Sequence, residues 1–146
     1  MALQLVPYSD ILIKDLSQIK ELIQDVIDDF GIPPMTTELL KYENHLYVSI
    51  DKSKYVGFIM PKLGDEVDIA FHEIPKHEGE FWLVRGMFID QYYQDIGIEF
   101  HVYQEFFKNR LGMLRVSPKQ YELKKIIKEL GFWNIKEDIY TNIPCY

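Results

Sequence analysis

The feature that most constrains the fold is an apolar run at residues 81–90, FWLVRGMFID. The run is too short to cross a membrane and has the length of a buried strand. Because apolar residues occupy nearly every position, we predict a strand that is buried on both faces of a sheet. A polar link and a glycine, Gly97, separate this run from a second apolar segment. The stretch therefore predicts a strand that leads into a helix.

Apolar residues at helical spacing occur in three segments. They predict helices over residues 15–30, 97–111 and 118–130, and a short helical turn is plausible after Thr36 or Thr37. The third helix has the clearest start signal, with Ser117 as N-cap and Gln120 three residues later. Gly131 stands where a helix-terminating glycine belongs. The inner side of the second helix is expected to carry Ile98, Val102, Tyr103, Phe106, Phe107 and Leu111.

Alternating, β-branched and aromatic segments predict the strands. We expect strands at residues 3–6 and 113–116, a hairpin formed by residues 45–50 and 55–60, and one bent or two separate strands in 132–146. Residues 67–73 are expected to lengthen the second hairpin arm or to form another strand. The order β-α-(α)-β-β-β-α-β-α-β(-β) predicts a single α/β domain over residues 1–146, with helices on the faces of a mixed sheet.

Composition limits the function more than it identifies it. The net charge of −7 argues against nucleic-acid binding, which needs a basic surface, and is compatible with a cationic partner such as an amine or polyamine. No window approaches eighteen apolar residues, so we expect no membrane span. The N-terminus lacks the basic and apolar segments of a secretory signal, and the single cysteine permits no internal disulfide. These features predict a cytoplasmic protein.

Three further patterns are weighed against ordinary structural roles. His72 and His77 superficially resemble a zinc motif, but the spacing is one residue too long and Pro75 interrupts any helix, so we expect no metal site. Cys145 has no nearby partner residue that would make it a nucleophile. Tyr92 and Tyr93 could line a pocket, although packing is the commoner role of aromatic residues beside a strand end.

The strand-to-helix step itself allows two interpretations. Backbone N–H groups and the helix dipole at such a step favour a phosphate group. Many strand-to-helix turns contain a glycine without binding anything, however. The residues alone leave both interpretations open.

The stretch FWLVRGMFIDQYYQDIGIEFHVYQEF resembles the acetyl-CoA-binding motif of the GNAT N-acetyltransferase superfamily. In that motif a strand leads into Q/R-x-x-G-x-G/A and a helix, and residues 94–99 here read QDIGIE. The residues around Arg85, Met87 and Tyr93 are similar to the diamine and spermidine acetyltransferase branch, with Arg85 displaced by one position. Residues 117–144 resemble the second motif of the family, with matches at Ile126 and at Gly131–Phe132.

The resemblance covers nearly the whole chain and implies a GNAT-like fold with a mostly antiparallel sheet. It also implies a bulge that splays the fourth strand from the fifth, acetyl-CoA as cosubstrate, and a small amine as acceptor. Residues 87–89 would contact the pantetheine, the amides after Gln94 would cradle the pyrophosphate, and Gln120 stands where the family has an asparagine. The implied cofactor-binding residues are Met87, Phe88, Ile89, Gln94, Asp95, Ile96, Gly97, Ile98, Glu99, Phe100 and Gln120.

The sequence departs from the family pattern at residues that matter for chemistry. The tyrosine that protonates the leaving thiolate in the family is Ile127 here, and the second small residue of the motif is Glu99. A carboxylate about 4 Å from a phosphate charge costs roughly 4 kcal/mol at an effective dielectric near 20. Acidic residues also suit an ordinary helix N-terminus. Glu73, Glu80 and Asp90 are acidic residues near the active strand, but their spacing does not identify a general base.

Two functions follow from the resemblance. One is an acetyl-CoA-dependent N-acetyltransferase that acts on a small amine. The other is a catalytically degenerate GNAT-like module with a binding or regulatory role. A homodimer is possible through the C-terminal strands, although the same apolar residues could simply close the core. These residues are Phe132, Trp133, Ile139 and Tyr140.

Overall fold

The computed structural model describes residues 3–30, 45–51, 54–93 and 96–144. A seven-stranded sheet is built from β1 (Leu3–Pro7), β2 (Leu46–Ile50), β3 (Lys54–Leu63), β4 (Phe81–Ile89), β5 (Leu111–Arg115), β6 (Trp133–Lys136) and β7 (Ile139–Thr141). The helices are α1 (Leu16–Phe30), α3 (Glu66–Phe71), α4 (Ile96–Phe107) and α5 (Tyr121–Glu129). Short 3₁₀ turns span Tyr8–Asp10, Ile13–Asp15 and Gln91–Tyr93. The predicted turn after Thr36 or Thr37, and Gln94, Asp95 and Cys145, lie outside the described residues.

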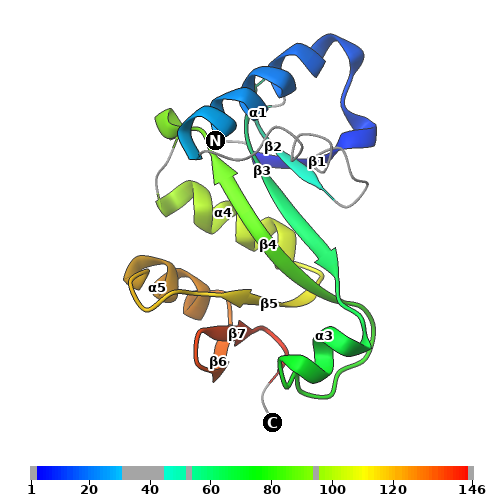
Figure 1. Ribbon diagram of the computed structural model, residues 1–146, viewed down its shortest axis with the longest axis vertical. Helices are drawn as coiled ribbons and strands as arrows, with labels where there is room; N and C mark the ends of the chain where they lie inside the picture. The colour runs from blue at the N-terminus through cyan, green and yellow to red at the C-terminus, as the bar shows by residue number, and fades with distance from the viewer. Residues whose placement is uncertain (1–2, 31–44, 52–53, 94–95, 145–146) are drawn as a thin grey trace.

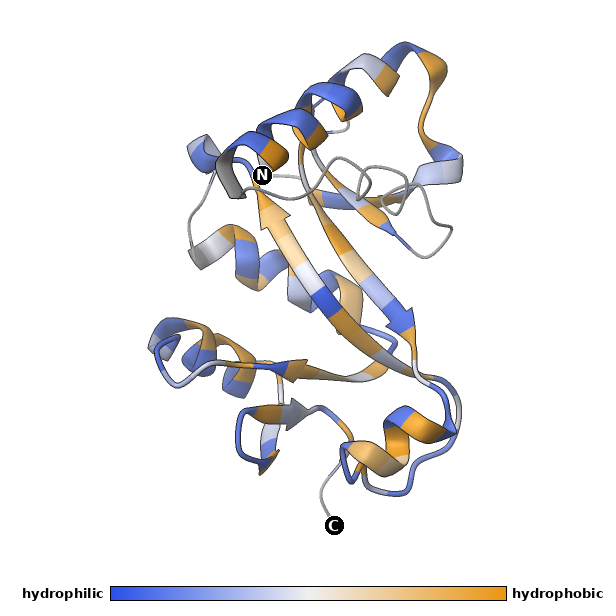
Figure 2. Cartoon of the chain, viewed as in Figure 1, coloured by the Kyte–Doolittle hydropathy of each residue, from blue (hydrophilic) through white to orange (hydrophobic). Residues whose placement is uncertain are grey.

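The strand order is β1-β2-β3-β4-β5-β7-β6, and every pair is antiparallel except β4–β5. The predicted α/β class with a mixed, mostly antiparallel sheet is confirmed. Figure 1 shows α1 and α3 at opposite ends of the long β3–β4 pair, with α4 and α5 beside β4 and β5. In Figure 2, β3 and β4 are mostly hydrophobic, whereas the helices carry hydrophilic and hydrophobic stripes. The helices therefore cover the sheet with their apolar sides.

Three hydrophobic clusters show which elements cover each face. The largest packs α4 and α5 against residues of β2 to β5, among them Val48, Ile59 and Leu114. A second packs α1 against Tyr47 and Phe58, and a third packs α3 near Phe81 and Met113. Because neighbouring strand residues point to opposite faces, the two smaller clusters lie on the face opposite α4 and α5. The middle of that face lies between α1 and α3.

Residues 67–73 form no strand, so that prediction is wrong. They lie in and after α3, whose start is fixed by a capping box. The Asp65 carboxylate accepts from the Asp68 amide at 2.8 Å, and the Asp68 carboxylate accepts from the Asp65 amide at 3.1 Å. Lys62 adds an ion pair to Asp68 at 3.0 Å. These local bonds favour a helix over an extended chain.

Two predicted boundaries are also corrected. The helix expected to reach Leu111 ends at Phe107, because Leu111 pairs with Phe81 at the start of β5. The last helix begins at Tyr121 rather than at Pro118. The predicted partners do interact, since the Gln120 side-chain oxygen accepts from the Ser117 amide at 2.9 Å, but they close a turn ahead of the helix.

The C-terminal segment forms two strands, one of the two alternatives, and Gly131 ends α5 with a φ of +88° as predicted. Phe132, Ile139 and Tyr140 are buried within the chain. They close the core, which was the alternative to a dimer contact.

Candidate functional site

A β-bulge interrupts the central strand pair beside a proline. Met60 pairs with Gly86 and Pro61 pairs with Val84, so Arg85 is an extra residue on β4. Proline has no amide hydrogen to donate to a ladder, and within sheets it is confined to edges, strand starts and bulges. A bulge bends its strand and increases the local twist. Pro61 on β3 therefore accounts for the change in direction of β4.

β4 and β5 separate at this point. Their parallel ladder holds only Phe81–Leu83 against Leu111–Met113. Beyond it β4 stays paired with β3 as far as Ile89, while β5 turns to β7 as far as Arg115. The two strands diverge into what we call the β4–β5 wedge, between residues 84–89 of β4 and 114–115 of β5 (Figure 1). The splay implied by the family resemblance is confirmed. We call the last β4–β5 pair, Leu83 with Met113, the apex of the wedge; it lies one residue before Val84, where the bulge begins.

The wedge explains why β4 is not buried as predicted. Only Phe81 and Ile89 of the strand are buried, whereas Arg85 is exposed and its other residues are intermediate. A strand that has lost one neighbour cannot be covered on both faces by regular packing. The prediction of a fully buried strand is wrong, and the lost neighbour accounts for residues 84–88 but not for Trp82 and Leu83, which are half-buried within the ladder.

The apex of the wedge is held by hydrogen bonds around Gly112. The Gly112 amide donates to the Asn142 side-chain oxygen at 2.8 Å, and the Thr141 hydroxyl donates to the Gly112 carbonyl at 2.8 Å. Asn142 also donates to the Arg110 carbonyl at 2.8 Å. These bonds hold β5 to the β7 side while Gly112 contacts the Trp82 backbone of β4. The protein's own hydrogen bonds therefore hold β5 in place at the end of the β4–β5 ladder.

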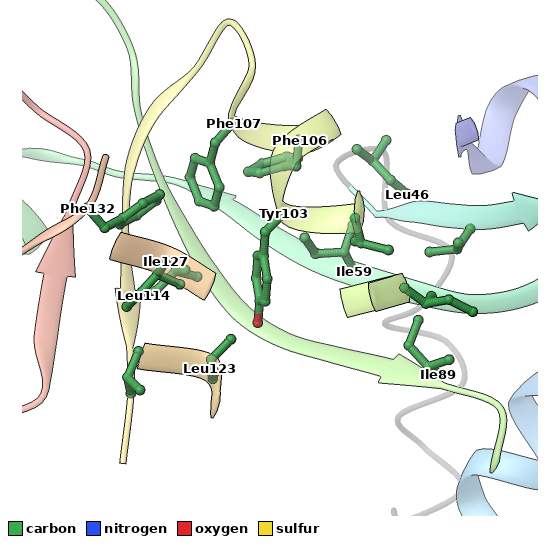
Figure 3. Close-up of a cluster of buried hydrophobic side chains, with 14 of the residues drawn as sticks. Leu46, Ile59, Ile89, Tyr103, Phe106, Phe107, Leu114, Leu123, Ile127 and Phe132 are labelled. Atoms are coloured by element: carbon green, nitrogen blue, oxygen red, sulfur yellow. The ribbon is translucent and has the colours of Figure 1, made fainter. Parts of the chain in front are cut away.

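Tyr103 of α4 places a phenol between α4 and α5. The side chain is only 7% exposed and belongs to the largest hydrophobic cluster. In Figure 3 its hydroxyl points away from Phe107 and toward Leu123 of α5. No hydrogen bond joins this hydroxyl to another described residue. Burial raises the pKa of Tyr103 well above its usual value, and the Glu99 charge adds to the effect, so the phenol stays protonated. Sequence periodicity placed Tyr103 inward but gave no sign of a role for its hydroxyl.

A hollow of about 450 Å³ lies where the first turns of α4 and α5 face each other. Its lining includes Glu99 from α4 and Lys119, Gln120 and Leu123 from α5 and the turn before it. Leu123 also belongs to the cluster that contains Tyr103, so the hollow adjoins the buried phenol. Two carboxylates, Glu99 and Glu122, share this hollow with a single lysine.

The structure brings together most of the predicted cofactor-binding residues that it describes. Met87, Phe88 and Ile89 lie on β4 along the wedge, and residues 96–100 form the first turns of α4, which follows β4 through a 3₁₀ turn. Gln120 lies across the hollow from Glu99. Ile127 is fully buried in the core, so the position of the missing tyrosine is filled by packing.

None of the three acidic residues considered as bases lies at the apex. Glu73 is exposed and pairs with Lys136 at 3.4 Å, and Glu80 is exposed near the start of β4. Asp90 lies at the opposite end of β4, where its carboxylate accepts from the Tyr92 amide at 3.0 Å. Tyr92 is 95% exposed and lines a hollow at the far end of β4, which was the first of the two alternatives, whereas Tyr93 packs against the largest hydrophobic cluster. Near the bulge the structure places a different group, the buried imidazole of His45, 3.2 Å from the Arg85 guanidinium.

Two other observations concern membrane spans and metal sites. None of the described helices is both long and apolar enough to span a bilayer. In the part of the chain that the structure describes, no three His, Cys, Asp or Glu side chains are grouped as metal ligands would be.

The fold matches that of solved structures described as acetyltransferases. Arabidopsis thaliana NAA60 in complex with acetyl-CoA superimposes with a TM-score of 0.62 at 16% identity, over 96% of each chain. A GNAT-family acetyltransferase from Streptococcus agalactiae gives a TM-score of 0.58 at 10% identity, over 95% of this chain and 92% of that one. The chain has the GNAT fold.

A third structure with this fold is described as histone acetyltransferase HPA2 and related acetyltransferase, from Corynebacterium glutamicum. It gives a TM-score of 0.61 at 11% identity, over 100% of this chain and 98% of that one. No protein-family model matches the sequence, and a search of curated proteins finds no significant match. At these identities the likeness establishes the GNAT fold, and the diamine and spermidine branch stays a prediction.

Proposed function

We propose that the protein is an acetyl-CoA-dependent N-acetyltransferase that acts on a small amine. The observation that carries this proposal is the β4–β5 wedge, a site where two adjacent strands of one sheet separate beside a bulge. A thin, extended ligand arm can add hydrogen bonds to a strand edge in the manner of an extra strand. NAA60, which shares the fold, is crystallised with acetyl-CoA.

The residues present fit most of an acetyl-CoA molecule. The backbone of Met87 to Ile89 would hold the pantetheine arm along the wedge, and the α4 N-terminus would attract the diphosphate through its dipole. The hollow between α4 and α5 would take the part of the cosubstrate that leaves the sheet. Glu99 is the poor fit, because its carboxylate lies on the wall of this hollow. Acetyl-CoA would supply the acetyl thioester that the amine attacks.

Tyr103 places a hydroxyl group at the largest hydrophobic cluster, between α4 and α5. The side chain is only 7% exposed, and a polar group with so little access to water usually has a hydrogen-bond partner. Here the hydroxyl points between α4 and α5, next to a residue of the hollow. We infer that its partner is an atom of the bound cosubstrate. Because its pKa is raised, Tyr103 acts as a hydrogen-bond donor, and water supplies the proton that the leaving thiolate needs.

Tyr103→Phe is expected to lower kcat/KM for acetyl-CoA about tenfold, which is the effect of one hydrogen bond to a polar ligand atom. The stability of the ligand-free variant should not fall, because phenylalanine keeps the packing and removes an unpartnered polar group. Steady-state kinetics and thermal unfolding measure the two effects. Tyr140→Phe, at a buried tyrosine on β7, is the matched control. Equal kinetics for Tyr103→Phe and the wild type would contradict the assigned role.

The direct test of the proposed function is the binding of acetyl-CoA. A ligand at a hundred times its Kd stabilises the folded state by about 2.7 kcal/mol, so the midpoint temperature of thermal unfolding should rise by several degrees. Turnover is then followed as coenzyme A release with a panel of amines. Binding without turnover on any amine would favour the second function, a catalytically degenerate binding module, which the loss of a tyrosine at Ile127 also favours. Absence of binding at millimolar acetyl-CoA would refute the acetyltransferase.

A further inference from the structure

Arg85 extends from the bulge across the face of the sheet to a buried histidine. Its Nη2 atom lies 3.2 Å from Nε2 of His45, which is 1% exposed. A guanidinium has only donors, so the imidazole Nε2 must accept, and His45 is neutral with its proton on Nδ1. The pair therefore carries one positive charge, and His45 fixes the direction of the guanidinium.

The pair lies on the face of the sheet opposite α4 and α5. Val84 and Met87, on either side of the bulge, pack into the cluster under α4 and α5, and so does Leu46 next to His45. Residue alternation along β2 then directs His45 to the other face, with Arg85 bonded to it. Of the described helices, α1 packs on that face at one end of β3 and β4 and α3 at the other end (Figure 1). Arg85, which is exposed, thus stands between these two helices, beside the apex of the wedge.

No carboxylate in the described part of the chain pairs with Arg85. Asp68, Glu73 and Asp138 each pair with another cation. Three acidic residues, Glu21, Asp25 and Asp90, line a separate hollow of about 630 Å³ at the far end of β4. That end also leads to the N-terminus of α4, where the proposed diphosphate would lie. The acetyl group would accordingly lie near the bulge, where the protein presents a cation.

We propose that Arg85 binds a carboxylate on the acceptor, so that the acceptor is an amino acid or a similar aminocarboxylic acid and not a polyamine. The inference rests on the proposed function and names its substrate class. An arginine fork matches a carboxylate in two parallel hydrogen bonds, and it repels a second ammonium group. The uncharged amine nitrogen forms the C–N bond as the C–S bond breaks. One proton leaves the nitrogen to water, and the thiolate takes one from water.

The test compares acceptors that differ by the carboxylate alone, lysine with cadaverine and phenylalanine with phenethylamine. The wild type should acetylate the carboxylate member of each pair with a kcat/KM about 10- to 30-fold higher. Arg85→Met should abolish this preference by raising the KM for the amino acid, with the KM for acetyl-CoA unchanged. Arg85→Glu should invert it for lysine and cadaverine. Arg85→Lys should retain part of it, because it keeps the charge without the fork.

Lys136→Met is the control, since Lys136 is a strand cation on β6, outside the wedge, that pairs with Glu73 at 3.4 Å. Its acceptor preference should equal that of the wild type, and thermal unfolding should show both methionine variants folded. A wild type that prefers the decarboxylated amines, or an Arg85→Met variant with the wild-type ratio, overturns the proposal.

The inference is also tested without turnover. Calorimetric titration with lysine and with cadaverine measures acceptor binding directly. Binding of lysine that is lost in Arg85→Met would support the carboxylate site even if no amine is acetylated, which would refute the acetyltransferase activity alone. Equal binding of lysine and cadaverine, or of lysine to both variants, overturns the inference.

Discussion

Replacing Gly112 by alanine is expected to lower the free energy of unfolding by about 3 kcal/mol. A Cβ atom at Gly112 would clash with the Trp82 carbonyl oxygen and would lie 2.6 Å from Cε1 of Phe107. The carbonyl belongs to the backbone of β4 and cannot move aside alone. Since Asn142 and Thr141 hold Gly112 from the β7 side, β5 cannot retreat either without breaking hydrogen bonds. The strain therefore falls on the short β4–β5 ladder.

Chemical denaturation measures this loss of free energy, and the midpoint temperature of thermal unfolding should fall by about 10 °C. Gly86→Ala is the matched control, because the nearest atom to its new methyl group would be the flexible end of Met60, at 2.8 Å. That variant should lose less than about 1 kcal/mol. Similar losses at both glycines would show that the apex of the wedge is not the rigid point that the hydrogen bonds around Gly112 indicate.

The local steps of the fold could be predicted because their signals are local. Three such signals are the apolar run of β4, the periodicity of α4 and the glycine after α5. Each of them involves only residues that are close in sequence. The missed helix α3 also has a local signal, the Asp65–Asp68 capping box. That signal does not decide the structure by itself, because the β-branched and aromatic residues after Glu66 suit a strand equally well.

The site could be predicted only in part, because its key features depend on strand register. The resemblance implied the splay, but the sequence does not show that Pro61 lies opposite the bulge at Arg85, since the two residues are brought together by pairing across the β3–β4 hairpin. The same holds for His45, which reaches Arg85 across β3. Tyr103 was assigned to the core by its spacing, and only the packing of α4 against α5 shows where its hydroxyl points.

The second large effect is expected at Glu99, where Glu99→Gln should raise the affinity for acetyl-CoA about 100-fold. The carboxylate lies in the first turn of α4 and on the wall of the hollow, where the diphosphate would bind. Two charges about 4 Å apart repel by roughly 4 kcal/mol at an effective dielectric of 20, and partial exposure of Glu99 reduces this to about 2–3 kcal/mol. That difference corresponds to about two orders of magnitude in Kd.

The same substitution should act in the opposite direction on stability. A carboxylate in the first turn of a helix interacts favourably with the helix dipole, so its loss costs about 0.3–1 kcal/mol. Calorimetry with acetyl-CoA and denaturation without it separate the two effects. Glu105→Gln removes the same charge from an exposed position of α4 and should change the affinity less than about threefold. If both variants bind acetyl-CoA with the wild-type Kd, the diphosphate does not lie at this helix end.

A gain in affinity for acetyl-CoA in the Glu99→Gln variant would also decide between the two proposed functions. An enzyme selected for turnover at ordinary cosubstrate concentrations gains nothing from a residue that repels acetyl-CoA, whereas a binding module for another ligand is under no such constraint. A wild-type Kd far above that of Glu99→Gln, together with slow turnover, therefore favours the degenerate module. A wild-type Kd already close to that of Glu99→Gln means that the Glu99 side chain turns away from the diphosphate, and the intact wedge then favours the enzyme.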